Sequence, residues 1–342
     1  MDTLILNENE ADKAAEIIKS GGVVGIPTET VYGLAANAFD PNAIKKIFLA
    51  KGRPADNPLI VHISKTEDVF KVVSEFNKKA EILAKNFWPG PLTMILPKNK
   101  QVPKIVTAGA DSVAVRFPSH VVARKIIELS GVPLVAPSAN LSGKPSTTRF
   151  SHVLEDLNGK VDAIINGGDC KFGVESTVIS LLESTPRILR PGAITPEQIE
   201  KVIGKIKIDD SVFHKIEKDK SVLSPGIKYK HYSPDAEVII LKGEKEDYAD
   251  FVNKTNIKRN DVLALCFDED IPLIDAPYIS YGSKKDSLSQ AHNIFDGLRK
   301  ADKMGAKAVY VHYCDTDGLS LAVYNRLIRA AGFKIIDLKN KT

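Results

Sequence analysis

The 342-residue sequence contains few cysteines, and they follow no recognisable pattern. Cys170, Cys266 and Cys314 are odd in number, lie far apart and have no paired spacing. Such a set indicates neither a disulfide framework nor a zinc knuckle. We therefore expect three reduced thiols.

Long apolar runs and low-complexity tracts are missing as well. No segment reaches the roughly 20 apolar residues needed to cross a bilayer, and the N-terminal stretch lacks the basic start and apolar run of a signal peptide. The hydrophobic content of 43% and the charged content of 26% are typical of globular proteins. We expect a soluble, cytoplasmic protein without a membrane partner.

Neither sign of charge is in large excess, and several catalytic signatures are absent. The 47 lysines and arginines exceed the 43 aspartates and glutamates by only four, which suits anionic ligands but falls short of the dense basic stripe of a dedicated nucleic-acid binder. No HExxH element or catalytic carboxylate pair is visible. Residues 168–173 resemble the start of a phosphate loop, but Val174 and Glu175 stand where lysine and serine or threonine are required.

The length predicts two domains. In the first two hundred residues, apolar runs alternate with amphipathic stretches, which is a mixed α/β pattern. Between about Ile206 and Pro234 the periodicity fades into a polar segment that we interpret as a linker. We expect a first domain at residues 1–205, a linker or lid at residues 206–234 and a second domain at residues 235–342.

The second domain shows strands alternating with helices. Strands are expected at residues 237–241, 262–267, 278–281, 308–312 and 334–338, with helices that include residues 288–304 and one from Leu319. This alternation predicts a three-layer, Rossmann-like domain with a largely parallel sheet.

One helix of the first domain has clear boundaries in the sequence. Asp40 is a good N-cap, Pro41 suits the first helical position, and Gly52 suits the C-terminal end. These boundaries place Lys51 at the C-terminus of the helix and Arg53 just beyond it.

Small, hydroxylated and basic residues gather in short segments at the ends of expected strands, where α/β proteins bind ligands. These segments are residues 27–34, 51–54, 57–62, 89–93, 115–118, 137–143, 167–169, 175–177 and 190–192. Together they resemble the long, two-domain threonylcarbamoyl-AMP synthases built on a YrdC-like domain. The hallmark of that family is a K-x-R element paired with a distant S-x-N element, here Lys51/Arg53 and Ser138/Asn140.

The resemblance covers nearly the whole chain, including the KYKHYSP stretch of the linker and residues 318–326. Ser320 departs from the pattern, because a glycine is expected there; this affects only the detail of the second domain. The resemblance implies a YrdC-like mixed α/β catalytic domain with a concave basic site, followed by a smaller Rossmann-like domain.

The resemblance also implies a reaction. L-threonine, bicarbonate or carbon dioxide, and ATP would give threonylcarbamoyl-adenylate and pyrophosphate, which makes the protein a nucleotidyltransferase acting in the first step of threonylcarbamoyladenosine formation next to the tRNA anticodon. Mg²⁺ would arrive with ATP, without metal ligands from the protein. A contact with tRNA and a downstream threonylcarbamoyl-transferase complex are the implied macromolecular partners.

Two groups of site residues follow from the same resemblance. The expected L-threonine-binding residues are Thr30, His62, Arg116, Ala136 and Ser176. The expected ATP-binding residues are Lys51, Arg53, Asn57, Ser112, Ser138, Asn140, Ser146, Arg190, His231 and Tyr232.

Several of these residues have plainer interpretations. Lys51 and Arg53 can simply oppose the negative end of a helix dipole. Arg116 can form a structural salt bridge instead of binding a substrate carboxylate. Arg190 can be a surface turn residue, and His62 a structural histidine at the end of a strand.

Residues 228–232 and the function as a whole also leave alternatives. The basic and aromatic linker residues can pack a domain interface or close as a lid over ATP. A non-catalytic module that binds tRNA or double-stranded RNA would show salt-dependent affinity without ATP turnover. A carbamoyltransferase that adenylates carbamoyl phosphate normally carries zinc-finger and acylphosphatase-like modules, which this chain lacks.

Overall fold

The computed structural model describes residues 2–215 and 232–340, and these form two compact units. The first unit comprises residues 2–142 and 146–212, and the second comprises residues 143–145, 213–215 and 232–340. The three cysteines are buried free thiols, as expected. Within the described ranges, no helix is long and apolar enough to cross a membrane.

The first unit is built on an 11-stranded mixed sheet. In spatial order its strands are β1 (Leu4–Asn7), β8 (Ala163–Asn166), β2 (Val24–Ile26), β3 (Gly33–Asn37), β7 (Leu134–Val135), β4 (Ile60–His62), β6 (Ser112–Arg116), β5 (Leu92–Pro97), β9 (Thr177–Ser180), β10 (Arg187–Arg190) and β11 (Lys207–Ile208). Parallel and antiparallel pairs alternate near the middle, where β6 runs parallel to β4 and antiparallel to β5. The mixed α/β fold class predicted from the sequence is confirmed.

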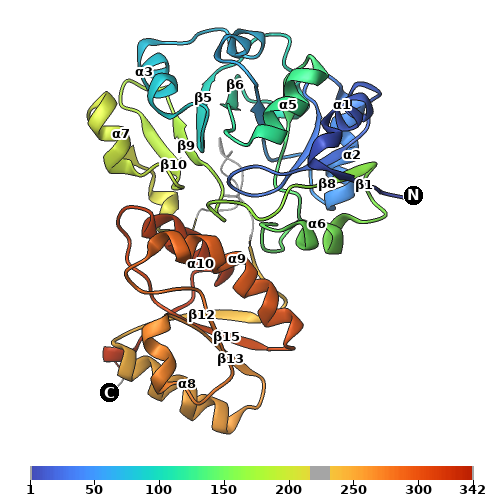
Figure 1. Ribbon diagram of the computed structural model, residues 1–342. Helices are drawn as coiled ribbons and strands as arrows, with labels where there is room; N and C mark the ends of the chain where they lie inside the picture. The colour runs from blue at the N-terminus through green and yellow to red at the C-terminus, as the bar shows by residue number, and fades with distance from the viewer. Residues whose placement is uncertain (1, 216–231, 341–342) are drawn as a thin grey trace. The chain divides into compact units, whose positions relative to one another are not determined.

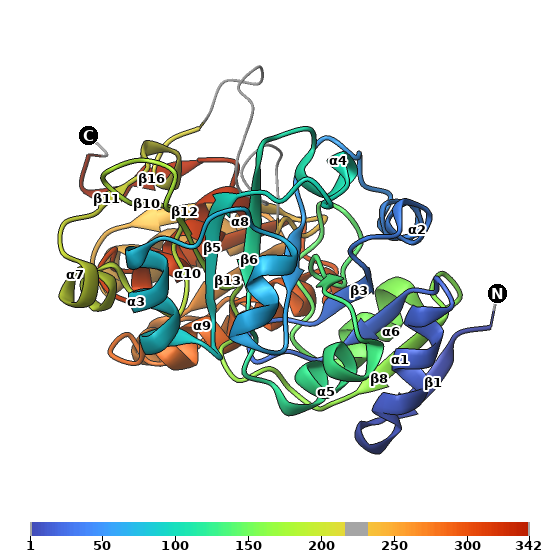
Figure 2. The same ribbon diagram turned by 90° about the horizontal axis from the view of Figure 1, so that it is seen from above.

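Helices flank this sheet. They are η1 (Glu8–Glu10), α1 (Ala11–Lys19), α2 (Pro41–Lys51), η2 (Thr66–Lys71), α3 (Lys78–Phe87), α4 (Lys104–Thr107), α5 (Val121–Ser130), α6 (Phe150–Leu157), α7 (Pro196–Ile203) and η3 (Asp210–Val212). Both views show α1 and α5 side by side (Figures 1 and 2). Their buried residues share one hydrophobic cluster, whereas those of α2, α3 and α6 belong to another.

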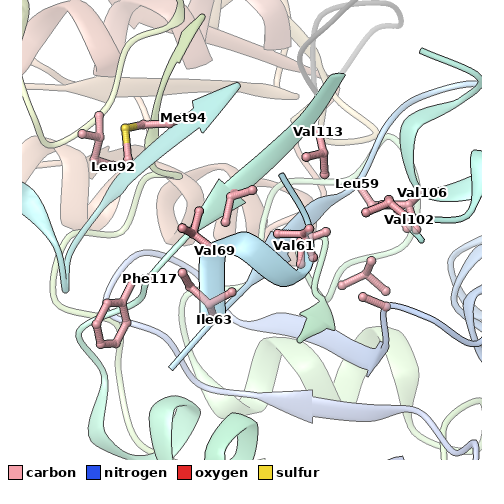
Figure 3. Close-up of a cluster of buried hydrophobic side chains, with 14 of the residues drawn as sticks. Leu59, Val61, Ile63, Val69, Leu92, Met94, Val102, Val106, Val113 and Phe117 are labelled. Carbon is pink, nitrogen blue, oxygen red and sulfur yellow. The ribbon is translucent and has the colours of Figure 1, made fainter. Parts of the chain in front are cut away.

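The two clusters lie on opposite faces of the sheet. In β3, Leu34 and Ala36 belong to the larger cluster, while Ala35 between them belongs to the smaller one. Successive side chains of a strand point to opposite faces, so the sheet is covered on both sides. Figure 3 shows Val61 of β4 and Met94 of β5 in the larger cluster, so both strands are packed on that face of the sheet. Each such aliphatic side chain contributes about 1.5 to 3 kcal/mol when fully buried.

Helix α2 begins and ends at the predicted residues. Asp40 caps it by accepting hydrogen bonds from the backbone N–H groups of Asn42 and Ala43, and Pro41 takes the first helical position. Gly52 adopts the left-handed conformation at φ +59°, which glycine reaches without steric cost and which ends the helix. The position of Lys51 as the last helical residue is therefore confirmed.

The first unit continues beyond residue 205. Strand β11 pairs with β10 through Arg187 and Ile188, and η3 follows directly. This part of the expected linker is thus ordered on the edge of the first sheet. Residues 216–231, which include most of the expected lid, lie outside the described part of the chain.

The second unit has a five-stranded, fully parallel sheet between helical layers. In spatial order the strands are β14 (Tyr278–Ser280), β13 (Val262–Cys266), β15 (Ala308–His312), β12 (Glu237–Lys242) and β16 (Ile335–Asp337). The helices are α8 (Lys245–Lys258), η4 (Asp268–Leu273), α9 (Ser287–Lys303), α10 (Ser320–Ala330) and η5 (Leu338–Asn340). Figure 1 shows α8 on one side of the strands and α9 and α10 on the other, as the Rossmann-like pattern predicts. Ser320 is the first residue of α10.

Candidate active site

Four neighbouring strands bring buried hydroxyl, imidazole and guanidinium groups into one row. His62 is the last residue of β4 and Arg116 the last of β6, and the two are paired in the parallel register. Thr93 of β5 is paired with Arg116 on the other side. Ser176 directly precedes β9, and its Oγ lies 2.8 Å from Oγ1 of Thr93. The row therefore contains three predicted L-threonine-binding residues, His62, Arg116 and Ser176, together with Thr93, which was not predicted.

Arg116 is 4% exposed and has three contacts. Its Nη2 lies 2.7 Å from Oε1 of Glu29, which makes an ion pair. Its Nη1 donates to Oγ1 of Thr30 at 2.9 Å, and its Nε donates to the carbonyl oxygen of Gly90 at 3.4 Å. The structural salt bridge considered for this arginine is therefore present, and it holds Thr30 next to the row.

Glu29 is ionised in this environment. Burial opposes ionisation of its carboxyl group, but the charge and hydrogen-bonding capacity of Arg116 outweigh that effect, so the pKa of Glu29 lies below its ordinary value. The ion pair therefore consists of two full charges, both nearly removed from water.

His62 is neutral. Burial disfavours the charged imidazole, and the positive charge of Arg116 adds to this, so the pKa of His62 is lowered to about 3. Its Nδ1 lies 3.2 Å from the carbonyl oxygen of Ile60 and donates to it when it carries the proton. In that tautomer Nε2 is an acceptor for a substrate hydroxyl or amino group.

The lowered pKa of His62 predicts a pH effect on stability. Between about pH 6.5 and pH 3 the unfolded chain binds a proton at this residue and the folded protein does not, so stability is lost as the pH falls through this window. We expect His62→Gln to remove a slope of about 1.4 kcal/mol per pH unit. Urea midpoints at pH 7.0, 6.0 and 5.0, followed by fluorescence of Trp88, the only tryptophan of the chain, measure this slope. Parallel pH profiles for both proteins would contradict the neutral state of His62.

Arg190 is the last residue of β10 and is only 6% exposed, so the interpretation as a surface turn residue is wrong. Its Nε donates to the carbonyl oxygen of Ser176 at 3.1 Å, and its Nη2 donates to the Oγ of Ser176 at 3.2 Å. Gly192 lets the chain after β10 lie close to the start of β9, because a Cβ at this position would lie 2.3 Å from the backbone nitrogen of Thr177. A predicted ATP-binding residue thereby contacts a predicted threonine-binding one.

Lys51 physically links the K-x-R and S-x-N elements. It is 3% exposed, and its Nζ donates to the carbonyl oxygen of Asn140 at 2.6 Å and to that of Ser138. Its own carbonyl oxygen accepts from the backbone N–H of Ser142 at 2.8 Å. Lys51 therefore does more than oppose the helix dipole, because its hydrogen bonds connect α2 to the 138–142 loop.

Arg53 and Asn57 form a second polar group after α2. Nη2 of Arg53 donates to the carbonyl oxygens of Asn57 at 3.0 Å and Pro58 at 3.2 Å. The Asn57 side chain is 1% exposed, and neither its amide nitrogen nor its oxygen has a hydrogen-bond partner among the described residues. Buried amides are normally satisfied, so this one is suited to a polar ligand.

Three further predicted residues of the first unit are Ser146, Ala136 and Ser112. Ser146 donates from Oγ to Oε1 of Glu175, and both are buried. The backbone N–H of Ala136 donates to the carbonyl oxygen of Ile60 at 3.1 Å, beside His62. Ser112 begins β6, about 13 Å along the strand from Arg116, so it is not part of the row at the other end.

Tyr232 belongs to the second unit. It is 5% exposed, its ring centroid lies 5.1 Å from that of Phe295, and the guanidinium of Arg326 lies 5.7 Å from it. His231 lies outside the described residues.

Sequence reasoning missed Glu29, Thr93 and Glu175. Each stands within a segment that was singled out, but a carboxylate or threonine there gives no signal of its own until its partner is known. For Glu29 that partner is Arg116, which is 87 residues away in the chain. Among the described residues, no group of three or more histidine, cysteine, aspartate or glutamate side chains could hold a metal ion.

Comparisons of the sequence and of the structure with known proteins point to the same family over nearly the whole chain. A family model described as "Telomere recombination" matches residues 16–192, and one described as "Threonylcarbamoyl-AMP synthase, C-terminal domain" matches residues 194–332. The chain is 46% identical to the threonylcarbamoyl-AMP synthase of Pyrococcus abyssi over 98% of this chain and 99% of the relative. It is 42% identical to that of Bacillus subtilis, over 98% and 96%. A crystal structure of P. abyssi Sua5 complexed with L-threonine matches with a TM-score of 0.92 at 44% identity, covering 98% and 99%.

Proposed function

The chain belongs to the threonylcarbamoyl-AMP synthase family, and on this premise we propose how its residues carry out the reaction. Its function is the synthesis of threonylcarbamoyl-AMP, the first step of threonylcarbamoyladenosine formation in tRNA. This function sets aside the non-catalytic RNA-binding module and the carbamoyl phosphate-adenylating enzyme. The observation that supports the residue roles is the row of His62, Arg116, Thr93 and Ser176.

L-threonine is proposed to occupy the end of this row. Its carboxylate would bind Arg116, whose planar guanidinium suits carboxylate geometry. Its hydroxyl would donate to Nε2 of neutral His62. The backbone at Ala136 and the hydroxyls of Thr30 and Ser176 would complete the threonine site.

ATP is proposed to bind beside the K-x-R and S-x-N elements. Arg53 and Arg190 would neutralise phosphate oxygens, and the uncommitted amide of Asn57 would take a polar group of the nucleotide. Lys51, Ser138, Asn140, Ser146 and Ser112 are proposed to complete the ATP site. Mg²⁺ would arrive with the nucleotide, because proteins usually hold it through substrate phosphates and one or two carboxylates.

The proposed chemistry makes the protein a nucleotidyltransferase. Threonine and bicarbonate give threonine carbamate, water and a proton. A carbamate oxygen then bonds to the α-phosphorus of ATP, and the bond to the bridging oxygen breaks as pyrophosphate leaves. Because carbamate, carboxylate and triphosphate repel one another, the arginines, and Mg²⁺ bound to the nucleotide, would position the reactants and neutralise their charges.

The product is a reactive mixed anhydride, so a second enzyme must consume it. We propose that a threonylcarbamoyl-transferase complex receives it in the cytoplasm and that a tRNA contact assists the transfer. Residues 228–232, with His231 and Tyr232, remain a proposed lid over the nucleotide.

Pyrophosphate release tests the proposed co-substrates. We expect release from ATP only when L-threonine and bicarbonate are both present, because only their joint product supplies the nucleophile. Serine differs from threonine by one methyl group, which a pocket typically values at about 1 to 3 kcal/mol, so serine should support slower turnover. Equal release with no amino acid would contradict the threonine assignment, and equal release in bicarbonate-depleted buffer would contradict the carbamate step.

A further inference from the structure

The Glu29 carboxylate is a buried acceptor with unused capacity. Its side chain is 5% exposed, and neither oxygen makes a hydrogen bond of regular geometry within the described residues. The Arg116 guanidinium lies 2.7 Å away as an ion-pair partner, and the backbone N–H groups of Glu29 and Ser119 help to lower the pKa of the carboxyl. A carboxylate can accept about four hydrogen bonds, and leaving a buried charged group unsatisfied is costly. The charge of Glu29 is therefore balanced, but not all of its acceptor positions are filled.

The groups around Glu29 indicate which donor would fill them. Arg116 offers a positive charge, Thr30 a hydroxyl, and His62 an uncharged ring, so Glu29 is the negative group of this cluster. Another nearby histidine, His120, has a pKa lowered by burial, which disfavours its cationic form. No second cation among these neighbours is available to Glu29. A further charged donor would therefore come from a bound ligand.

An amino acid in its zwitterionic form matches this arrangement. It carries one carboxylate and one ammonium group on the same carbon, and Arg116 and Glu29 present one guanidinium and one carboxylate side by side. A ligand with a carboxylate alone would add a second negative charge next to Glu29, in surroundings that screen charges poorly. An ion pair of this kind therefore favours a ligand with both charges over a simple acid.

We propose that Glu29 binds the ammonium group of the incoming amino acid and so selects the zwitterion, with Arg116 as its counterpart for the carboxylate. This inference rests on the proposed function, because it assumes that L-threonine binds at the row. It adds a role that the predicted site residues did not include. It also explains why a buried carboxylate stands in a site that otherwise gathers anions.

The test combines a protein variant with a ligand that lacks one group. Binding of L-threonine and of (R)-3-hydroxybutyrate, the same molecule without its amino group, is measured by calorimetry with the full chain and with Glu29→Gln. Glutamine keeps the shape of the side chain but removes its charge. Glu81→Gln, in the exposed part of α3, is the matched control and should leave both affinities unchanged.

The proposal predicts opposite responses. In Glu29→Gln, threonine affinity should fall by about 30-fold or more, the lower end of what losing a partner of a buried charge pair costs. Affinity for (R)-3-hydroxybutyrate should stay the same or rise, because its carboxylate no longer meets a second negative charge. Equal losses for both ligands would overturn the proposal and leave Glu29 as a support for Arg116. Unchanged affinities for both would also overturn it.

Two further outcomes keep the test decisive. If Glu29→Gln does not fold, the parent protein alone decides: (R)-3-hydroxybutyrate that binds as tightly as threonine overturns the role of the ammonium group, and a weaker affinity by about 30-fold supports it. If the parent protein does not bind threonine at all, the proposed function fails together with this inference. If threonine binds, but no more tightly than (R)-3-hydroxybutyrate, only the role of Glu29 is wrong and the proposed function stands.

Discussion

Arg116→Ala is expected to abolish threonine binding while leaving ATP affinity within a few-fold of the parent protein. The guanidinium lies at the end of β6, 4% exposed, between Glu29, Thr30 and Gly90, and it supplies the positive charge of the proposed carboxylate site. Removing it leaves the Glu29 carboxylate buried and unpaired, so the same site then repels the substrate carboxylate. Calorimetry with each ligand separately measures both effects.

The same substitution should lower stability. Removing one partner of a buried ion pair typically costs about 3 to 5 kcal/mol, because the remaining charge loses its compensation. A double variant, Arg116→Met with Glu29→Leu, should regain much of this stability, since replacing both charges by apolar groups of similar size is often neutral. Threonine binding should not return. The two variants thus separate the role of Arg116 in folding from its role in binding.

Arg53→Ala is the comparison for ligand identity. Arg53 follows α2 and donates to the carbonyl oxygens of Asn57 and Pro58, and we propose that it binds phosphate, so its loss should weaken ATP and spare threonine. If both arginine variants lose the same ligand, the division into an amino-acid end and a nucleotide end is wrong.

The sequence predicted those features that depend on neighbouring residues. The boundaries of α2 follow from Asp40, Pro41 and Gly52, which act within one turn of the chain. The parallel sheet of the second unit follows from strands and helices that alternate regularly. Neither prediction requires knowledge of a distant contact.

Features that depend on distant contacts could not be predicted in this way. Strand β8 lies between β1 and β2 although its paired residues are 159 positions from β1 and 139 from β2, and periodicity gives no partner for a strand. Glu29 is a similar case, because the same residue in the same short motif would be unremarkable without Arg116 beside it. The resemblance to a family supplied Arg116, but only the fold shows which carboxylate it meets.

Lys51 shows how a residue predicted for ligand binding can have a structural role that the sequence does not reveal. Its place at the end of α2 was predicted, whereas its bonds to the carbonyl oxygens of Ser138 and Asn140 depend on a loop about ninety residues later. The ammonium group fixes that loop against the helix, and the loop carries the side chains proposed for ATP. Stability and nucleotide affinity should therefore depend on the same lysine.

Lys51→Met is expected to destabilise the first unit by about 3 kcal/mol or more, because hydrogen bonds to a charged group contribute about 1.5 to 3 kcal/mol each and the two carbonyl oxygens lose their donor. It should also raise the KM for ATP, while threonine affinity changes little because Arg116 and Glu29 are untouched. Lys46→Met is the matched control: Lys46 lies on the same helix and also donates to a backbone carbonyl, that of Gly21 at 2.7 Å, but in an exposed position. Its loss should lower the free energy of unfolding by no more than about 0.5 kcal/mol.

Urea unfolding followed by the fluorescence of Trp88 compares the two variants in the first unit alone, since the second unit contains no tryptophan. Equal midpoints for the two variants would show that the buried bonds of Lys51 do not hold the 138–142 loop, and an unchanged KM for ATP in a destabilised Lys51→Met would separate that loop from nucleotide binding.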